Sequence, residues 1–211
     1  MSLVTIVDRV TEWARAAICE KIELKAPPPG AEDATDEAAA GLYQLVHPAA
    51  FALYVPTAEK LPPEILSPFP SVCVRIESGS DSMSENKRSV RLQLCFSAWN
   101  PGDHGADIAL PENGENGRFW RRWEGAESDA YFRRSGDGWR DAWNFLDLAL
   151  QQLQSAGTVG GYRLDKSAPI EYGPLKDQEG IPDFYPYWFN WLSFSIETDL
   201  RRYVPEYDEL L

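Results

Sequence analysis

Few side chains in this sequence could do chemistry, and the most suggestive group surrounds His104. The chain contains two His residues, and Asp103 and Asp107 lie close to this one in a stretch rich in Gly and acidic residues. Imidazole and carboxylate groups are ordinary metal ligands, but a metal site needs each ligand oriented by further hydrogen bonds. A polar loop explains the same residues more simply. We therefore predict no metal site.

A carboxylate pair and a glycine group are the other chemical candidates. Glu171 and Asp183 flank aromatic residues, but acid–base catalysis by two carboxylates depends on a separation that sequence does not define. We interpret both as strand-end or surface groups. Gly157, Gly160 and Gly161 follow a helical pattern instead of preceding one, and no Gly-Lys-Ser/Thr segment accompanies them, so they do not form a phosphate cradle. We predict no catalytic residue, no cofactor and no enzyme.

The three Cys residues, Cys19, Cys73 and Cys95, lack the spacing of metal ligands. Each lies in a run with a helix-like or strand-like apolar pattern, and free Cys is among the most often buried residue types. We expect buried, reduced thiols, which fit a reducing compartment. The first 22 residues lack a basic leading segment, so we expect no signal peptide. No apolar run is long enough to predict a membrane span.

The elements that would position these residues are organised around a helix predicted over 137–157. Its apolar residues recur at spacings of three and four, and polar residues occupy the other face. Asp137 is placed to cap the first turn, and Gly157 to end the helix in a left-handed conformation. Such a helix is stabilised mainly by packing, so it needs a surface to cover. The predicted apolar stripe is Trp139, Ala142, Trp143, Leu146, Ala149, Leu150 and Leu153.

A predicted pair of strands supplies part of that surface. Residues 71–77 and 89–98 alternate between apolar and polar side chains, with a polar, Gly-containing stretch over 78–87 between them. This pattern predicts an antiparallel hairpin with a long loop and one polar face.

The longest predicted strand covers residues 187–198. Its first residues are apolar on both sides, which indicates burial on both faces, and Ser193 and Ser195 then predict a solvated face. Shorter strands are predicted over 162–164 and 169–172.

These patterns predict an α+β fold. We expect a mixed, mainly antiparallel sheet, a long amphipathic helix packed on it, and an N-terminal helix over 3–18 that ends before the prolines at 27–29. The length fits one domain with long insertions or two small domains, and we predict a single domain over 1–211 with inserted loops at about 27–70 and 100–136.

Composition restricts the class of partner. The formal net charge is −13, and a surface that grips nucleic acid needs clustered Lys and Arg, so we predict no specific nucleic-acid binding. Aromatic residues make up 12% of the chain, which argues against a disordered protein because such chains are poor in aromatics.

Aromatic residues and Arg are concentrated in the segment Phe119–Trp123. One interpretation is a short amphipathic helix whose Trp residues seal the edge of a core. The other is a contact patch, because aromatics and Arg are enriched at interface centres. The aromatic residues at the start of the last strand allow the same two interpretations, core packing or a contact patch. The candidate self-association or partner-contact residues are Phe119, Trp120, Trp123, Tyr187, Phe189 and Trp191.

The order of motifs carries a family resemblance. Asp137-Gly-Trp-Arg-Asp opens a helix, Ala168-Pro-Ile-Glu-Tyr follows, and Tyr185-Pro-Tyr-Trp-Phe-Asn-Trp begins the last strand. This order resembles minor structural proteins of tailed bacteriophages and prophages, and is similar to the tail terminator, or tail completion, class. The resemblance covers about residues 71–98 and 137–198.

The resemblance implies a compact α+β domain that acts by assembly. Its expected partners are further copies of itself in a hexameric ring, the tail tube protein and the head-tail connector protein. The expected location is the virion or the bacterial host cytoplasm, without a membrane partner. A second function class stays open: an acidic binding module, similar to immunity or inhibitor proteins, that neutralises a basic partner protein.

Overall fold

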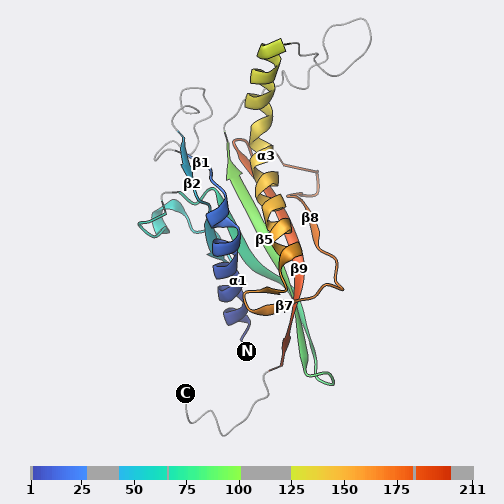
Figure 1. Ribbon diagram of the computed structural model, residues 1–211. Helices are drawn as coiled ribbons and strands as arrows, with labels where there is room; N and C mark the ends of the chain where they lie inside the picture. Colours follow the sequence, from blue (N-terminus) through green and yellow to red (C-terminus); the bar gives the residue numbers. More distant parts are fainter. Residues whose placement is uncertain (1, 28–42, 66, 101–124, 183, 201–211) are drawn as a thin grey trace, which may run out of the picture.

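A computed structural model gives the arrangement of the chain (Figure 1). It describes residues 2–27, 43–65, 67–100, 125–182 and 184–200. For residues 125–138 it describes the backbone only. The helical elements are α1 (Leu3–Ala17), η1 (Cys19–Lys21), η2 (Ala58–Lys60) and α3 (Gly125–Ser155). The strands are β1 (Leu24–Ala26), β2 (Gln44–Val46), β3 (Ala49–Ala52), β4 (Ser71–Ser82), β5 (Lys87–Trp99), β6 (Thr158–Val159), β7 (Tyr162–Leu164), β8 (Glu171–Pro174) and β9 (Tyr187–Asp199).

The strands form one mixed sheet and a small separate pair. The larger sheet is seven-stranded in the order β3-β4-β5-β9-β7-β6, and β8 also pairs with β9. β3 runs parallel to β4, and the other pairs are antiparallel. β1 and β2 pair with each other. The predicted α+β class with a mixed sheet is confirmed.

Both helices lie on the same face of the sheet (Figure 1). α1 contacts β3 and β4, whereas α3 contacts β5 and β9. Residues at alternate positions of the central strands project toward the helices and are buried: Val72, Val74, Val90, Leu92, Leu94, Phe96, Leu192, Phe194 and Ile196. The period of two in the sequence therefore defines the covered face of the sheet. Among the described residues, no helix is long and apolar enough to cross a membrane.

The N-terminal helix forms where its apolar spacing predicts it. Ser2 caps α1, its hydroxyl accepting the backbone N–H of Thr5 at 3.2 Å. Ile6, Val10 and Ala14 lie along one stripe and are fully buried. This helix is stabilised by the cap and by burial of that stripe.

The second helix differs from its prediction at both ends. α3 begins at Gly125, so the predicted start at Asp137 is wrong. It ends at Ser155, where the N–H of Ala156 donates to the carbonyl of Gln152 at 3.0 Å. Gly157 is not left-handed, so the predicted cap at that residue is also wrong. The last turn is closed by backbone bonds, which leaves no need for a left-handed residue there.

The buried stripe of α3 is also rotated from the predicted one. Phe145, which the prediction left out, is fully buried with its ring 5.0 Å from that of Phe96 at 72°, an edge-to-face geometry. Trp139, which the prediction included, is 46% exposed. The helical period allows several neighbouring stripes, and the position of β5 selects one of them.

The β4–β5 hairpin is longer than predicted. The strands continue to Ser82 and resume at Lys87, so the predicted loop over 78–87 is mostly strand. Arg88 donates to both carboxylate oxygens of Asp81 at 2.7 Å across the strands. A bidentate ion pair of this kind stabilises the pairing of the two strands. The segment is so polar that its sequence pattern does not predict a strand.

The face of the sheet opposite the helices carries a polar ladder. Arg75 donates to Gln93 at 2.6 and 2.8 Å, and Arg91 pairs with Glu77 and with Glu171 of β8. The hydroxyl of Ser193 donates to Glu77 at 2.7 Å. The hairpin therefore has the polar face that the alternation of apolar and polar residues predicts.

Two Ser residues of β9 differ from expectation on this face. Ser193 and Ser195 are buried, so the solvated face predicted for them is wrong. Their side chains are short and lie between the longer members of the ladder, which exclude water from them.

The turn between β6 and β7 fixes the position of α1. Gly160 and Gly161 have φ of 58° and 82°, as a tight hairpin turn of two left-handed residues requires. A Cβ at Gly160 would lie 2.8 Å from the backbone carbonyl of Arg9. We expect Gly160→Ala to lower the free energy of unfolding by about 2–4 kcal/mol, through strain and steric overlap.

Gly157→Ala is the matched control, because a Cβ there meets nothing within 4 Å. Its effect should stay within about 0.5–1 kcal/mol. Urea unfolding followed by circular dichroism measures both variants. Equal losses for the two would contradict the packing of α1 on this turn.

The contact between α3 and β5 gives a second stability prediction. Phe145→Ala should cost about 3–5 kcal/mol, because it leaves a cavity beside Phe96 in the core. Asn144, the preceding and exposed residue of the same helix, is the control, and Asn144→Ala should change stability by less than about 0.5 kcal/mol. Thermal unfolding measures the difference, and a loss under about 1 kcal/mol for Phe145→Ala would refute this packing.

Candidate functional site

Predicted contact residues of the last strand lie at the start of β9. Tyr187, Phe189 and Trp191 occupy alternate positions, so they project from the face opposite α1 and α3, and all are half-buried. The other predicted contact residues lie outside the described part of the chain: Phe119, Trp120 and Trp123.

Aromatic rings surround two of these residues. The ring of Phe69 lies 4.9 Å from that of Tyr187 and 6.0 Å from that of Phe189, measured between centroids. Phe184 lies 5.6 Å from Phe189 at 87°. Tilted and edge-to-face pairs at these distances are favourable for aromatic rings. Phe69 therefore packs against both Tyr187 and Phe189, and Phe184 packs against Phe189 as well.

Trp191 is engaged differently. Its indole N–H donates to the backbone carbonyl of Pro174 at 3.1 Å. A Cβ added to Gly173 would lie 3.5 Å from the indole ring, so the ring covers β8 closely. Trp191 thus joins β8 to β9 within the chain, and the structure does not bring it to the cleft that Tyr187 and Phe189 line.

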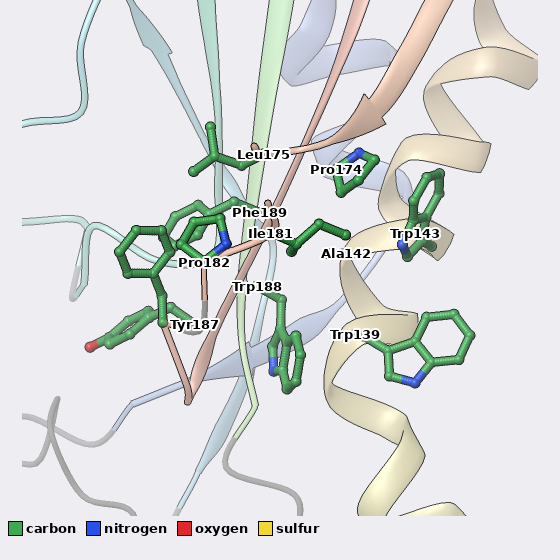
Figure 2. Close-up of a pocket in the computed structure, with 11 residues that line it drawn as sticks. Trp139, Ala142, Trp143, Pro174, Leu175, Ile181, Pro182, Tyr187, Trp188 and Phe189 are labelled. Atoms are coloured by element: carbon green, nitrogen blue, oxygen red, sulfur yellow. The ribbon is translucent and has the colours of Figure 1, made fainter. Parts of the chain in front are cut away.

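That cleft is an apolar depression of about 390 Å³ between α3, the segment after β8 and the start of β9 (Figure 2). We call it the aromatic cleft. Its lining residues are Trp139, Ala142, Trp143, Pro174, Leu175, Ile181, Pro182, Phe184, Tyr187, Trp188 and Phe189.

Large apolar side chains of the aromatic cleft remain open to solvent. Ile181 is 67% exposed, Phe184 47% and Trp139 46%, and Leu175 is also exposed. Single exposed apolar residues are common, but several beside one concave surface are typical of an interaction site. The aromatic cleft is therefore the best-supported binding surface among the described residues.

A buried polar junction fixes α3 against the strands beside this cleft. The indole N–H of Trp188 donates to the backbone carbonyl of Asn100 at 3.2 Å, and the Asn100 amide donates to Asp141 at 2.8 Å. The ammonium of Lys25 donates to the Asn100 side-chain oxygen at 3.3 Å. Asn100 is 1% exposed, so these bonds replace the water that its polar groups would otherwise need. They join α3 to the start of β9, two of the elements that line the aromatic cleft.

The chemistry of the aromatic cleft is that of binding. Its described lining contains no charged side chain, so it offers no acid–base pair and no carboxylate ligand. Shifted pKa values occur elsewhere: the hydrogen bond to Glu197 raises the pKa of Lys87, and hydrogen bonds from Ser167 lower that of Asp165. Across the described residues, no group of three or more His, Cys, Asp or Glu could hold a metal ion.

Of the candidate carboxylate pair, Glu171 lies in the described part of the chain. Glu171 pairs with Arg91 in the polar ladder, and the Nδ1 of His47 lies 2.9 Å from the carbonyl oxygen of Ile22. Asp183 and the group around His104 lie outside the described residues.

Sequence reasoning missed most of the aromatic cleft. The sequence predicts Trp139 and Trp143 in the buried stripe of the helix, and it predicts no contact residue over 175–184. The signal in the sequence that could have indicated this surface is a set of apolar residues in the segment after β8, Leu175, Ile181 and Phe184. Apolar side chains in a loop have no strand or helix face to bury them.

Comparison with protein-family models finds no family that matches, and comparison with curated proteins finds no matching relative.

The aromatic cleft should bind an apolar fluorescent probe. We expect 8-anilinonaphthalene-1-sulfonate to brighten on the folded chain, because it can enter an apolar depression of this size. Phe184→Glu should reduce the signal by more than half, since a carboxylate there opposes the sulfonate and adds polarity. Met83→Glu, at the exposed tip of the β4–β5 hairpin, is the control and should bind as the parent does. Equal fluorescence from both variants would place the probe elsewhere.

Proposed function

We propose that this chain is a structural subunit of a bacteriophage or prophage tail, a tail-terminator-like protein. In this role, copies form a hexameric ring that caps the tail tube and joins it to the head connector. The motif order over 137–191 suggests the family, and the α+β architecture is compatible with it. The placement of exposed apolar residues is the observation that carries the proposal.

Exposed apolar residues gather on two opposite sides of the sheet. One group is the aromatic cleft beside β8 and β9. The other lies beside the opposite edge, where the exposed Leu53 and Tyr54 follow the edge strand β3. We call this second group the β3 patch. A subunit with two different exposed apolar surfaces on opposite sides suits head-to-tail contact between copies.

Head-to-tail contact has a direct consequence for assembly. When two different surfaces of one chain meet, each added copy presents the same free surface again, and a suitable rotation closes the series into a ring. Assembly of this kind requires no catalytic group. The formal charge of −13 fits a ring that DNA passes through without binding, because an acidic surface does not neutralise phosphate.

Self-association is the first test. Light scattering across a concentration series should show mass rising from one copy toward a closed ring. Phe184→Glu in the aromatic cleft, or Tyr54→Glu in the β3 patch, should weaken association at least tenfold without unfolding, because each places a charge in an apolar contact. Met83→Glu should associate as the parent does. A chain that stays monomeric near millimolar concentration would overturn the self-association.

Mixing the two variants distinguishes the kind of contact. In head-to-tail association, Phe184→Glu retains an intact β3 patch and Tyr54→Glu retains an intact aromatic cleft. Their mixture should therefore form a heterodimer that cannot extend further, although neither variant associates alone. Absence of a heterodimer would show that the two surfaces do not meet.

Binding to the end of a tail tube is the part of the proposed role that self-association does not test. Electron microscopy of the chain mixed with tubes of the tail tube protein from the same genome should show density at one tube end. A monomer that leaves tube ends bare would favour the acidic binding module, which acts by electrostatic attraction to a basic protein.

A further inference from the structure

Two of the three Cys residues stand opposite each other in the sheet. Cys73 of β4 is the register partner of Cys95 of β5. Val72, Val74, Leu94 and Phe96, the residues on either side of them, belong to the core under the helices. Because successive side chains of a strand point to opposite faces, both thiols project from the face opposite α1 and α3.

The backbone bonds set the distance between them. The N–H groups of Ala49 and Leu53 donate to the carbonyls of Pro70 and Val74, so even-numbered residues of β4 face β3. Cys73 consequently directs its backbone groups to β5, and it forms a hydrogen-bonded pair with Cys95. The Cα atoms of such a pair lie about 5.5 Å apart, and disulfides span about 4.4–6.8 Å between Cα atoms. The Cβ atoms need to approach by only about 1 Å.

The surroundings of the two thiols differ. Cys73 is 6% exposed, beside Phe51 in the sheet register, and burial raises its pKa to about 11. Cys95 is only half-buried, and its Sγ donates to the Gln93 side-chain oxygen at 3.4 Å. Arg75 holds that oxygen in place. A reagent in solvent therefore reaches Cys95 first.

We propose that Cys73 and Cys95 form a dithiol modification site that closes to an intramolecular disulfide when a small-molecule disulfide such as oxidised glutathione reaches Cys95. The Cys95 thiolate attacks one sulfur of the reagent, forms a mixed disulfide and releases one glutathione thiolate. The Cys73 thiolate then attacks the Cys95 sulfur and releases the second. The protein loses two protons and two electrons, and the reagent is reduced to two glutathione molecules.

The remaining thiol provides an internal reference. Cys19 is 1% exposed in the core cluster beneath the helices, and burial raises its pKa to about 12. It has almost no exposed surface and no partner thiol on its side of the sheet. Oxidation is thus confined to Cys73 and Cys95. The resulting disulfide would join β4 to β5 by a covalent bond in the middle of the sheet.

The test is oxidation of the folded chain with oxidised glutathione at pH 8.5, followed by intact mass and thiol titration. We expect two of the three thiols to disappear, without a retained adduct, and dithiothreitol to restore them. The initial rate should rise roughly tenfold per pH unit between pH 7 and pH 8.5, because the thiolate is the attacking species.

Single variants separate the steps. Cys73→Ser should retain one glutathione on Cys95, because no second thiol displaces it. Cys95→Ser should react at least tenfold more slowly, and Cys19→Ala should react as the parent does. A stable adduct on the parent chain, a disulfide between two chains, or reaction only in urea would each overturn the proposal.

Discussion

Burial of one face of the central strands beneath two helices is the constraint on which the structure depends. β4, β5 and β9 direct alternate apolar side chains to α1 and α3, and the edge-to-face contact of Phe96 with Phe145 lies within that layer. Removing such side chains from water is the main favourable term in folding. The positions of the helices, the register of the strands and the β6–β7 turn must all be compatible with the burial of this face.

One consequence is a sheet with two unlike faces. The covered face is apolar, whereas the opposite face holds the Arg91–Glu77–Glu171 ladder and the Cys73–Cys95 pair. Ion pairs at such positions contribute little to stability, so their effect here is chiefly to fix the positions of side chains between strands. The thiols are held opposite each other by the same register that buries their neighbours. Their juxtaposition is a by-product of the core packing on the other face.

A second consequence is that the edges of the sheet carry the apolar surface available for contact. α3 covers the sheet but does not bury Trp139, and the segment after β8 leaves Ile181 and Phe184 exposed beside it. The junction of Trp188, Asn100 and Asp141 joins α3 to the start of β9 beside these residues. On the opposite side, Leu53 and Tyr54 follow β3. The fold thus separates a hydrophobic interior from two exposed apolar surfaces at the edges of the sheet.

Local pattern alone determined the α+β class, the N-terminal helix, the antiparallel alternation of β4 and β5, and the extent of β9. Each depends on a period of 3.6 or 2 that neighbouring residues fix among themselves. Only tertiary structure decided that α3 buries Phe145 instead of Trp139, that polar residues 78–82 continue a strand, and that Ser193 is buried. It also brought Phe69 to Tyr187 and Cys73 to Cys95. These outcomes depend on which residues distant in sequence become neighbours, and no local period specifies those distances.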